Sequence, residues 1–156
     1  MPSVASTLKI SIRETITLNN NKYDSFVTSE INNINEISKR IVTVPTTAQE
    51  IIQVSGSIGP GAYITEDVIY VRISNLDDVN HVDLTFRNFH SDEFALKLDK
   101  GQTFIYPGLT TGGVSSSMVA KDAAAVDTEL SMGSLTKVIA QASGSAVDIE
   151  MVVASS

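Results

Sequence analysis

Apolar and polar residues alternate along the first part of the chain. The apolar residues of this segment occupy even positions: Leu8, Ile10, Ile12, Ile16 and Leu18. A period of two places one set of side chains on a buried face of a strand and the other set in water. The pattern therefore predicts a β-strand with one buried face. Asparagines at 19–21 predict its end, because asparagine tolerates turn and left-handed conformations.

Residues 23–44 carry a more ambiguous pattern. Four isoleucines fall within one stripe of a helix: Ile31, Ile34, Ile37 and Ile41. That spacing favours an amphipathic helix, but β-branched isoleucines and the neighbouring asparagines are poor helix formers. We expect short strands and turns that end in a strand at 40–44, with a helix over residues 28–41 as the alternative. Pro45 interrupts the pattern, and residues 51–54 predict the next strand.

The centre of the chain contains two alternating segments, 69–74 and 82–87, separated by a polar loop. Pairing them as a hairpin with Arg72 opposite Asp83 aligns their apolar residues on one face. That register satisfies the apolar face and a cross-strand ion pair together. We therefore predict a hairpin here.

Two further hairpins are predicted from their turn residues. Asp99-Lys100-Gly101 is typical of a three-residue connection with glycine in the left-handed position, and it sets Leu96 against Phe104. Gly144-Ser145 is a favoured two-residue turn between segments 136–143 and 146–153.

Eight to ten short strands separated by turn residues predict an all-β fold, either an antiparallel β-sandwich or a jelly roll. About 30% of the residues are Val, Ile or Thr, which pack well on pleated sheets. With 156 residues and no proline-rich or charged linker, the chain is expected to form a single domain over residues 1–156. The small-residue-rich segment 107–134 is expected to be a long excursion with a functional or interface role.

Composition and charge narrow the function classes. The net charge is −7, and the 11 Lys and Arg residues are scattered, so direct nucleic-acid binding is not expected. There are no cysteines, which excludes disulfides and thiolate metal sites. The first residues lack the pattern of a signal peptide, and apolar runs fall far short of the ~20 residues needed to span a bilayer. We expect a soluble, cytosolically made protein without a membrane partner.

No catalytic, cofactor-binding or metal-binding residues are predicted, and the chain is not expected to be an enzyme. His81 and His90 match no common metal spacing and are interpreted as structural. The acidic pairs 66–67, 77–78 and 92–93 are interpreted as turn residues, with calcium as a minor alternative. The glycine-rich segment 56–61 lacks the lysine and the following helix of a phosphate loop and is interpreted as a turn.

Aromatic residues leave one binding alternative open. Tyr63 and Tyr70 are the candidates for exposed rings, which would suit a carbohydrate-binding module or an interface anchor. A cupin-like enzyme has little support, because its metal requires clustered histidine and carboxylate ligands.

Three stretches carry a family resemblance: Arg40-Ile41-Val42-Thr43-Val44-Pro45-Thr46-Thr47, Tyr70-Val71-Arg72-Ile73-Ser74-Asn75-Leu76-Asp77, and the segment from Glu93 to Ile105. Together with the valine-rich C-terminal strand, they resemble small all-β virion structural proteins of tailed bacteriophages. These stretches are strand and turn patterns and contain no catalytic signature.

The resemblance implies a capsid decoration, or cement, protein located on the virion after synthesis in the host cytoplasm. It implies the major capsid protein or another virion protein as partner. We also expect a homo-oligomer, with a trimer favoured because it suits three-fold sites of an icosahedral lattice. The alternatives are a head or tail fibre component and a carbohydrate-binding adhesion module.

Overall fold

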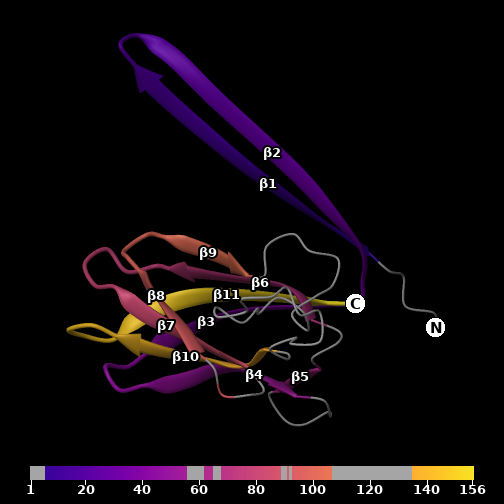
Figure 1. Ribbon diagram of the computed structural model, residues 1–156, viewed down its shortest axis with the longest axis vertical. Coiled ribbons are helices and arrows are strands. Elements are labelled where there is room, and N and C mark those ends of the chain that lie inside the picture. Colours follow the sequence, from indigo (N-terminus) through magenta and orange to yellow (C-terminus); the bar gives the residue numbers. More distant parts are fainter. Residues whose placement is uncertain (1–5, 56–61, 65–67, 89–90, 92, 107–134) are drawn as a thin grey trace, which may run out of the picture. The chain divides into compact units, whose positions relative to one another are not determined.

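The computed structural model describes residues 6–55, 62–64, 68–88, 91, 93–106 and 135–156. These residues form eleven strands in three sheets (Figure 1). The strands are β1 (Ser6–Leu18), β2 (Asn21–Ile34), β3 (Glu36–Val44), β4 (Gln49–Ser55), β5 (Ala62–Ile64), β6 (Val68–Asn75), β7 (Val82–Asn88), β8 (Glu93–Leu98), β9 (Thr103–Tyr106), β10 (Leu135–Ala142) and β11 (Val147–Ser155). Ten pair antiparallel, β5 runs parallel to β4, and none of the sheets closes into a barrel. The predicted all-β, sandwich-like fold is confirmed.

The chain divides into two compact units, Met1–Asn35 and Glu36–Ser156. Among the described residues, β1 and β2 pair only with each other, in a separate two-stranded sheet. The expectation of a single domain over residues 1–156 stays a prediction. Only Asn35 lies between the end of β2 and the start of β3. No change in composition marks this boundary, so a search for linkers does not reveal it.

The first unit is one long hairpin. Its ladder runs from Ser6 opposite Ile34 to Leu18 opposite Asn21. Asn19 and Asn20 occupy the turn with φ of 50° and 65°, the left-handed conformations that a two-residue hairpin loop requires. The predicted first strand and its end are confirmed. The helical alternative for residues 28–41 is wrong, because these residues belong to β2 and β3 apart from Asn35.

The second unit contains a five-stranded sheet of order β5-β4-β10-β7-β8 and a four-stranded sheet of order β3-β11-β6-β9 (Figure 1). Apolar residues of both sheets form one core, whose largest fully buried side chains include Phe86, Ile52, Leu84, Ile73 and Met151. The rings of Phe94 and Phe104 lie against Phe86, with centroids 4.8 Å and 5.5 Å away. Because Phe104 belongs to β9 and the other two to β7 and β8, this cluster joins the two sheets.

The predicted hairpin between residues 69–74 and 82–87 is wrong. Strand β6 pairs with β11 and β9, whereas β7 pairs with β10 and β8, so Arg72 and Asp83 lie in different sheets. Both strands alternate because each turns one face towards the same core. Alternation therefore cannot distinguish neighbours in one sheet from strands that face each other across a sandwich.

The other two predicted pairings fail for the same reason. Leu96 of β8 pairs with Leu84, and Phe104 of β9 pairs with Ile73, so β8 and β9 belong to opposite sheets. Strands β10 and β11 are likewise separated. The turn residues themselves are confirmed, because Gly101 and Gly144 have φ of +68° and +74°. They allow the chain to pass from one sheet to the other instead of closing a hairpin.

Buried Asn75 helps to hold two of these crossings together. Its side-chain amide donates to the carbonyl oxygens of Asn80 at 3.0 Å and Leu98 at 3.1 Å. Asn75 ends β6 in one sheet, and Leu98 ends β8 in the other. Strand periodicity in the sequence cannot predict a side chain that fixes two chain crossings in this way.

Several interpretations concern segments outside the described residues. These are the glycine-rich segment 56–61, the acidic pair 66–67, His90, Asp92 and the excursion 107–134.

Candidate functional site

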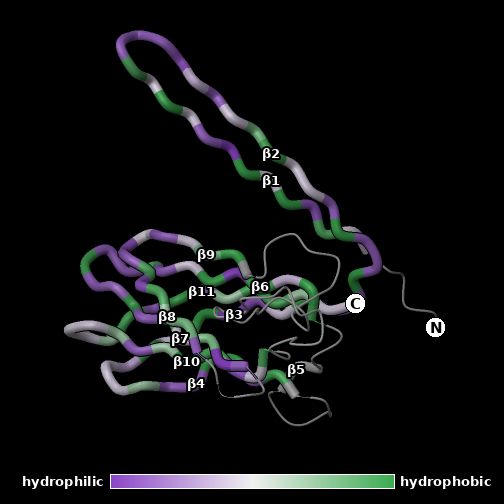
Figure 2. The backbone as a smooth tube through the Cα atoms, viewed as in Figure 1, coloured by the Kyte–Doolittle hydropathy of each residue, from purple (hydrophilic) through white to green (hydrophobic). Residues whose placement is uncertain are grey.

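The two faces of the β1–β2 hairpin differ sharply in polarity. The register places the even-numbered residues of β1 on the same face as the odd-numbered residues of β2. We define the apolar face of the hairpin as Leu8, Ile10, Ile12, Ile16, Leu18, Tyr23, Val27 and Ile31. Figure 2 shows apolar and polar positions alternating along β1. Four polar residues share this face: Glu14 and Ser25, which pair with each other, Ser29 opposite Ile10, and Asn21 opposite Leu18.

Most of the apolar face is exposed to solvent. Ile12, Ile16, Leu18, Tyr23 and Val27 retain between 43% and 60% of their accessible surface. Only Ile10 of this face is buried, at 9%. The expectation that the even-numbered face of the first strand is buried is therefore wrong over most of its length. Scattered exposed apolar residues are ordinary, whereas large exposed apolar patches mark interaction sites. Here the Glu14–Ser25 pair lies between two exposed groups, one with Ile12 and Val27 and one with Ile16, Leu18 and Tyr23.

The opposite face of the hairpin is polar. Lys9 and Glu30 form an ion pair at 3.3 Å between exposed side chains, which contributes little to stability. Phe26 is the one large apolar residue on this face, and it is 67% exposed. The first unit contains three acidic and three basic residues, so the formal net charge of −7 belongs to residues 36–156.

One feature of the sequence indicates that this strand extends beyond a compact sheet, and that feature is its length. An alternating pattern that continues from residue 8 to residue 18 is longer than most strands of a compact sheet. The sequence pattern does not distinguish Tyr23 and Phe26 from core aromatic residues, because their exposure depends on which elements cover them.

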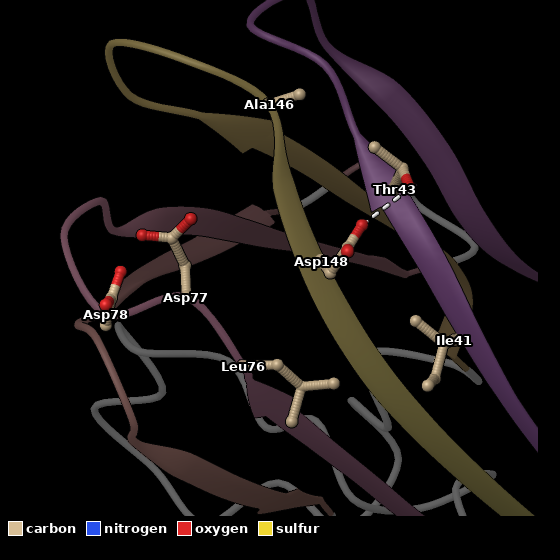
Figure 3. A pocket seen from close by; sticks show the side chains of 7 residues that line it. All are labelled: Ile41, Thr43, Leu76, Asp77, Asp78, Ala146 and Asp148. Carbon is tan, nitrogen blue, oxygen red and sulfur yellow. Dashed lines mark hydrogen bonds between the residues drawn. The ribbon is translucent and has the colours of Figure 1, made fainter.

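A depression of about 490 Å³ is lined by residues of the second unit (Figure 3). Its lining residues are Ile41, Thr43, Leu76, Asp77, Asp78, Ala146 and Asp148. The carboxylate of Asp77 accepts hydrogen bonds from the backbone amides of Asn80 at 2.6 Å and Val79 at 2.7 Å. These bonds lower the pKa of Asp77, since they stabilise its charged form.

Asp148 of this depression is also engaged, because it accepts a hydrogen bond of 2.6 Å from the hydroxyl of Thr43. The interpretation of Asp77 as a turn residue is confirmed by its bonds to the loop backbone. No group of three or more His, Asp or Glu residues within the described ranges could hold a metal ion. The depression therefore contains structural carboxylates rather than an assembled ligand set.

One group of side chains superficially resembles the spatial arrangement of a hydrolytic triad: Ser143, His81 and Asp83. Ser143 Oγ lies 3.0 Å from His81 Nδ1, and His81 Nε2 lies 3.7 Å from Asp83 Oδ1. However, Ser143 Oγ also donates to the carbonyl of His81 at 3.1 Å and accepts from its amide at 3.2 Å. These backbone bonds use the hydroxyl to tie the end of β10 to the start of β7. The side chain of Asp83 is also more than half exposed, unlike the buried orienting acid of a triad.

The tyrosines proposed for sugar binding are not open platforms. Tyr70 is buried to 4% exposure, and its burial raises the pKa of the phenol. Tyr63 packs against the core, and its hydroxyl lies 3.0 Å from Ser38 Oγ. Neither ring is presented as sugar stacking requires. Among the residues that the structure describes, the large exposed aromatic side chains are Tyr23 and Phe26, together with Phe94 at 37%.

Comparison of the chain with protein-family models, with curated proteins and with solved structures gave no match. Among the residues that the structure describes, no helix is long and apolar enough to cross a membrane. The chain is thus a small all-β protein with sandwich-like sheets, and its most distinctive surface is the apolar face of the hairpin.

Proposed function

We propose that this protein is a non-enzymatic virion structural protein that decorates and stabilises the head of a tailed bacteriophage. The observation that carries the proposal is the exposed apolar face of the hairpin, which suits a protein that completes its packing in an assembly. The family resemblance supplies the particular setting. Its three stretches fall on β3, on β6 and on the β8–β9 segment, which belong to the framework of the second unit.

The size of the apolar face supports the proposal that the protein associates with another protein surface and does not act as an isolated monomer. Its exposed apolar residues, on both sides of the Glu14–Ser25 pair, together expose roughly 500 Å², and exposed apolar areas of this size on a monomer are often functional. An isolated two-stranded hairpin is at best marginally stable in water. Contact with another surface would both stabilise the hairpin and cover its apolar residues.

In this proposal the partner is the major capsid protein or another protein of the particle, and the protein is located on the virion. The net charge of −7 resides in the second unit, where it would complement a basic patch of a capsid surface. No catalytic residue is assigned, in keeping with the structural use of Ser143 and of Asp77.

The test uses heads of the phage that encodes the chain, prepared without this protein. We expect saturable binding of the purified chain to these heads, with density at regular lattice positions in electron micrographs. The temperature at which the heads release DNA should rise on binding. Heads that already carry the protein are the control and should bind no more. Absence of binding, together with absence of the chain from purified virions, would overturn the proposal.

The same micrographs distinguish capsid decoration from a role as a head or tail fibre component. Density on the tail or on fibres, with none on the head lattice, would replace decoration by a role as a fibre component. A carbohydrate-binding role has lost its main support, since Tyr63 and Tyr70 are not displayed.

A further inference from the structure

We infer that the apolar face of the hairpin is covered by the same face of a second copy of this chain. The inference goes beyond the proposed function because it names the occupant of this surface, and it holds wherever the protein is located. It rests on three properties of residues 6–34: polarity of the two faces, exposed area and charge.

The distribution of polarity indicates face-to-face packing. Pairing of a second copy along the free edge of β1 would extend the sheet but leave Ile12, Ile16 and Val27 in water. Stacking of two hairpins through their apolar faces covers these residues, as in the interior of a sandwich whose sheets lie ~10 Å apart. The polar faces, with the Lys9–Glu30 ion pair, then point outward on both sides.

The exposed area reaches the lower limit for a specific contact. Each copy exposes roughly 500 Å² on this face, so a symmetric pair would bury at most about 1,000 Å² in total, which is the smallest size expected of a specific interface. The contact is isologous, because the same patch is used by both copies, and this is the commonest arrangement of homodimers. It predicts a dimer in place of the trimer that the family resemblance favours.

Charge also favours a second copy at this surface. The first unit has no net formal charge, so two hairpins approach without the repulsion expected between the acidic second units. Glu14 is the one charged residue on the same side as the apolar face. Because it lies on an edge strand, its exposed side chain can extend past the rim of the contact into water.

The test compares two lysine substitutions in the full-length chain. Ile16→Lys places a charge on the apolar face, whereas Thr15→Lys adds the same charge to the neighbouring residue on the polar face, opposite Asp24. By light scattering at about 100 µM, we expect a dimer for the unmodified chain and for Thr15→Lys. Ile16→Lys should weaken association at least about tenfold, since it buries an unpaired charge.

Hydrogen exchange locates the contact and shows whether the variants fold. The amides of residues 6–34 should become more protected as concentration rises in the unmodified chain and in Thr15→Lys, but not in Ile16→Lys. The core strands β6 and β11 should keep equal protection in all three proteins. A monomer at every concentration, or an oligomer that Ile16→Lys leaves intact, would overturn the inference. Head binding is a separate measurement, so failure of self-association is distinguishable from failure of the proposed function.

Discussion

The guanidinium of Arg72 on β6 donates a hydrogen bond to the carboxylate of Glu150 on the adjacent strand β11. Lys39 on β3, the other neighbour of β11, places its ammonium 3.5 Å from the second oxygen of the same carboxylate. Glu150 thus connects three neighbouring strands of the four-stranded sheet. The hydrogen bond from Arg72 is the largest cause of the lowered pKa of Glu150.

This lowered pKa predicts a pH dependence of stability. Because the pKa of Glu150 is lower in the folded than in the unfolded chain, its ionised form favours folding above the ordinary glutamate pKa of about 4.3. That contribution is lost as pH falls through the folded-state value. Glu150→Gln should therefore flatten the decline of the free energy of unfolding between about pH 5 and pH 3. Denaturant titrations at several pH values measure this slope.

Glu36→Gln is the matched control for Glu150→Gln, because it removes the same charge from an exposed position at the start of β3. Its profile should follow that of the unmodified chain. Identical acid profiles for Glu150→Gln and the unmodified chain would contradict the role assigned to the Arg72–Glu150 pair.

Phe86 should be among the most costly residues to truncate. Its fully buried ring contacts Phe94 and Phe104 and so lies where the two sheets meet. Phe86→Ala should lower the free energy of unfolding by about 3–5 kcal/mol through lost burial and a residual cavity. Phe26→Ala removes the same ring from an exposed position and should change stability by only about 0.5 kcal/mol. Chemical denaturation of both variants checks the contrast, and equal costs would contradict it.

Two glycines with similar backbone angles should respond differently to alanine. Gly101 and Gly144 have φ of +68° and +74°, so alanine at either site carries about 1–2 kcal/mol of left-handed strain. A Cβ at Gly101 would meet nothing within 4 Å, whereas one at Gly144 would lie 2.9 Å from Asn80 Oδ1. Gly144→Ala should therefore have the lower melting temperature.

Asn80→Ala in the Gly144→Ala background removes the crowding atom and separates the two costs at residue 144. Asn80 also donates a hydrogen bond to Ser145 Oγ, so Asn80→Ala should destabilise the unmodified chain. It should destabilise the Gly144→Ala background less, because there it also relieves the crowding of the new Cβ. Additive effects of the two substitutions would show that crowding is absent.

Ser143 is expected to stabilise the fold through its hydrogen bonds and not to serve as a nucleophile. Ser143→Ala removes a hydroxyl that bonds the backbone of His81 and should cost about 1 kcal/mol in the free energy of unfolding. The unmodified chain should also resist covalent labelling by a fluorophosphonate, which reacts with activated serines. Labelling that disappears in Ser143→Ala would instead reveal an activated nucleophile.

Local structure followed closely from local sequence. Alternation located β1, β6 and β7, and the asparagine turn and the positive φ of Gly101 were predicted from residue type alone. These features depend on contacts within a few residues, where backbone sterics and side-chain direction act directly.

The candidate site was predictable only in part. The even-numbered apolar residues of β1 were identified from their spacing, yet they were assigned to a buried face. Exposure of Ile16 and Tyr23 depends on whether another element covers the hairpin, and periodicity carries no information about this.

By itself, the sequence determined the strands, their apolar sides and the positions where the chain turns. Only the tertiary structure decided which strands are neighbours: Arg72 lies beside Glu150, 78 residues away, and not beside Asp83. It also decided that the apolar side of the first hairpin is exposed. The physical reason is that a strand with one apolar side can bury it in many ways, and the choice depends on the combined packing of all strands.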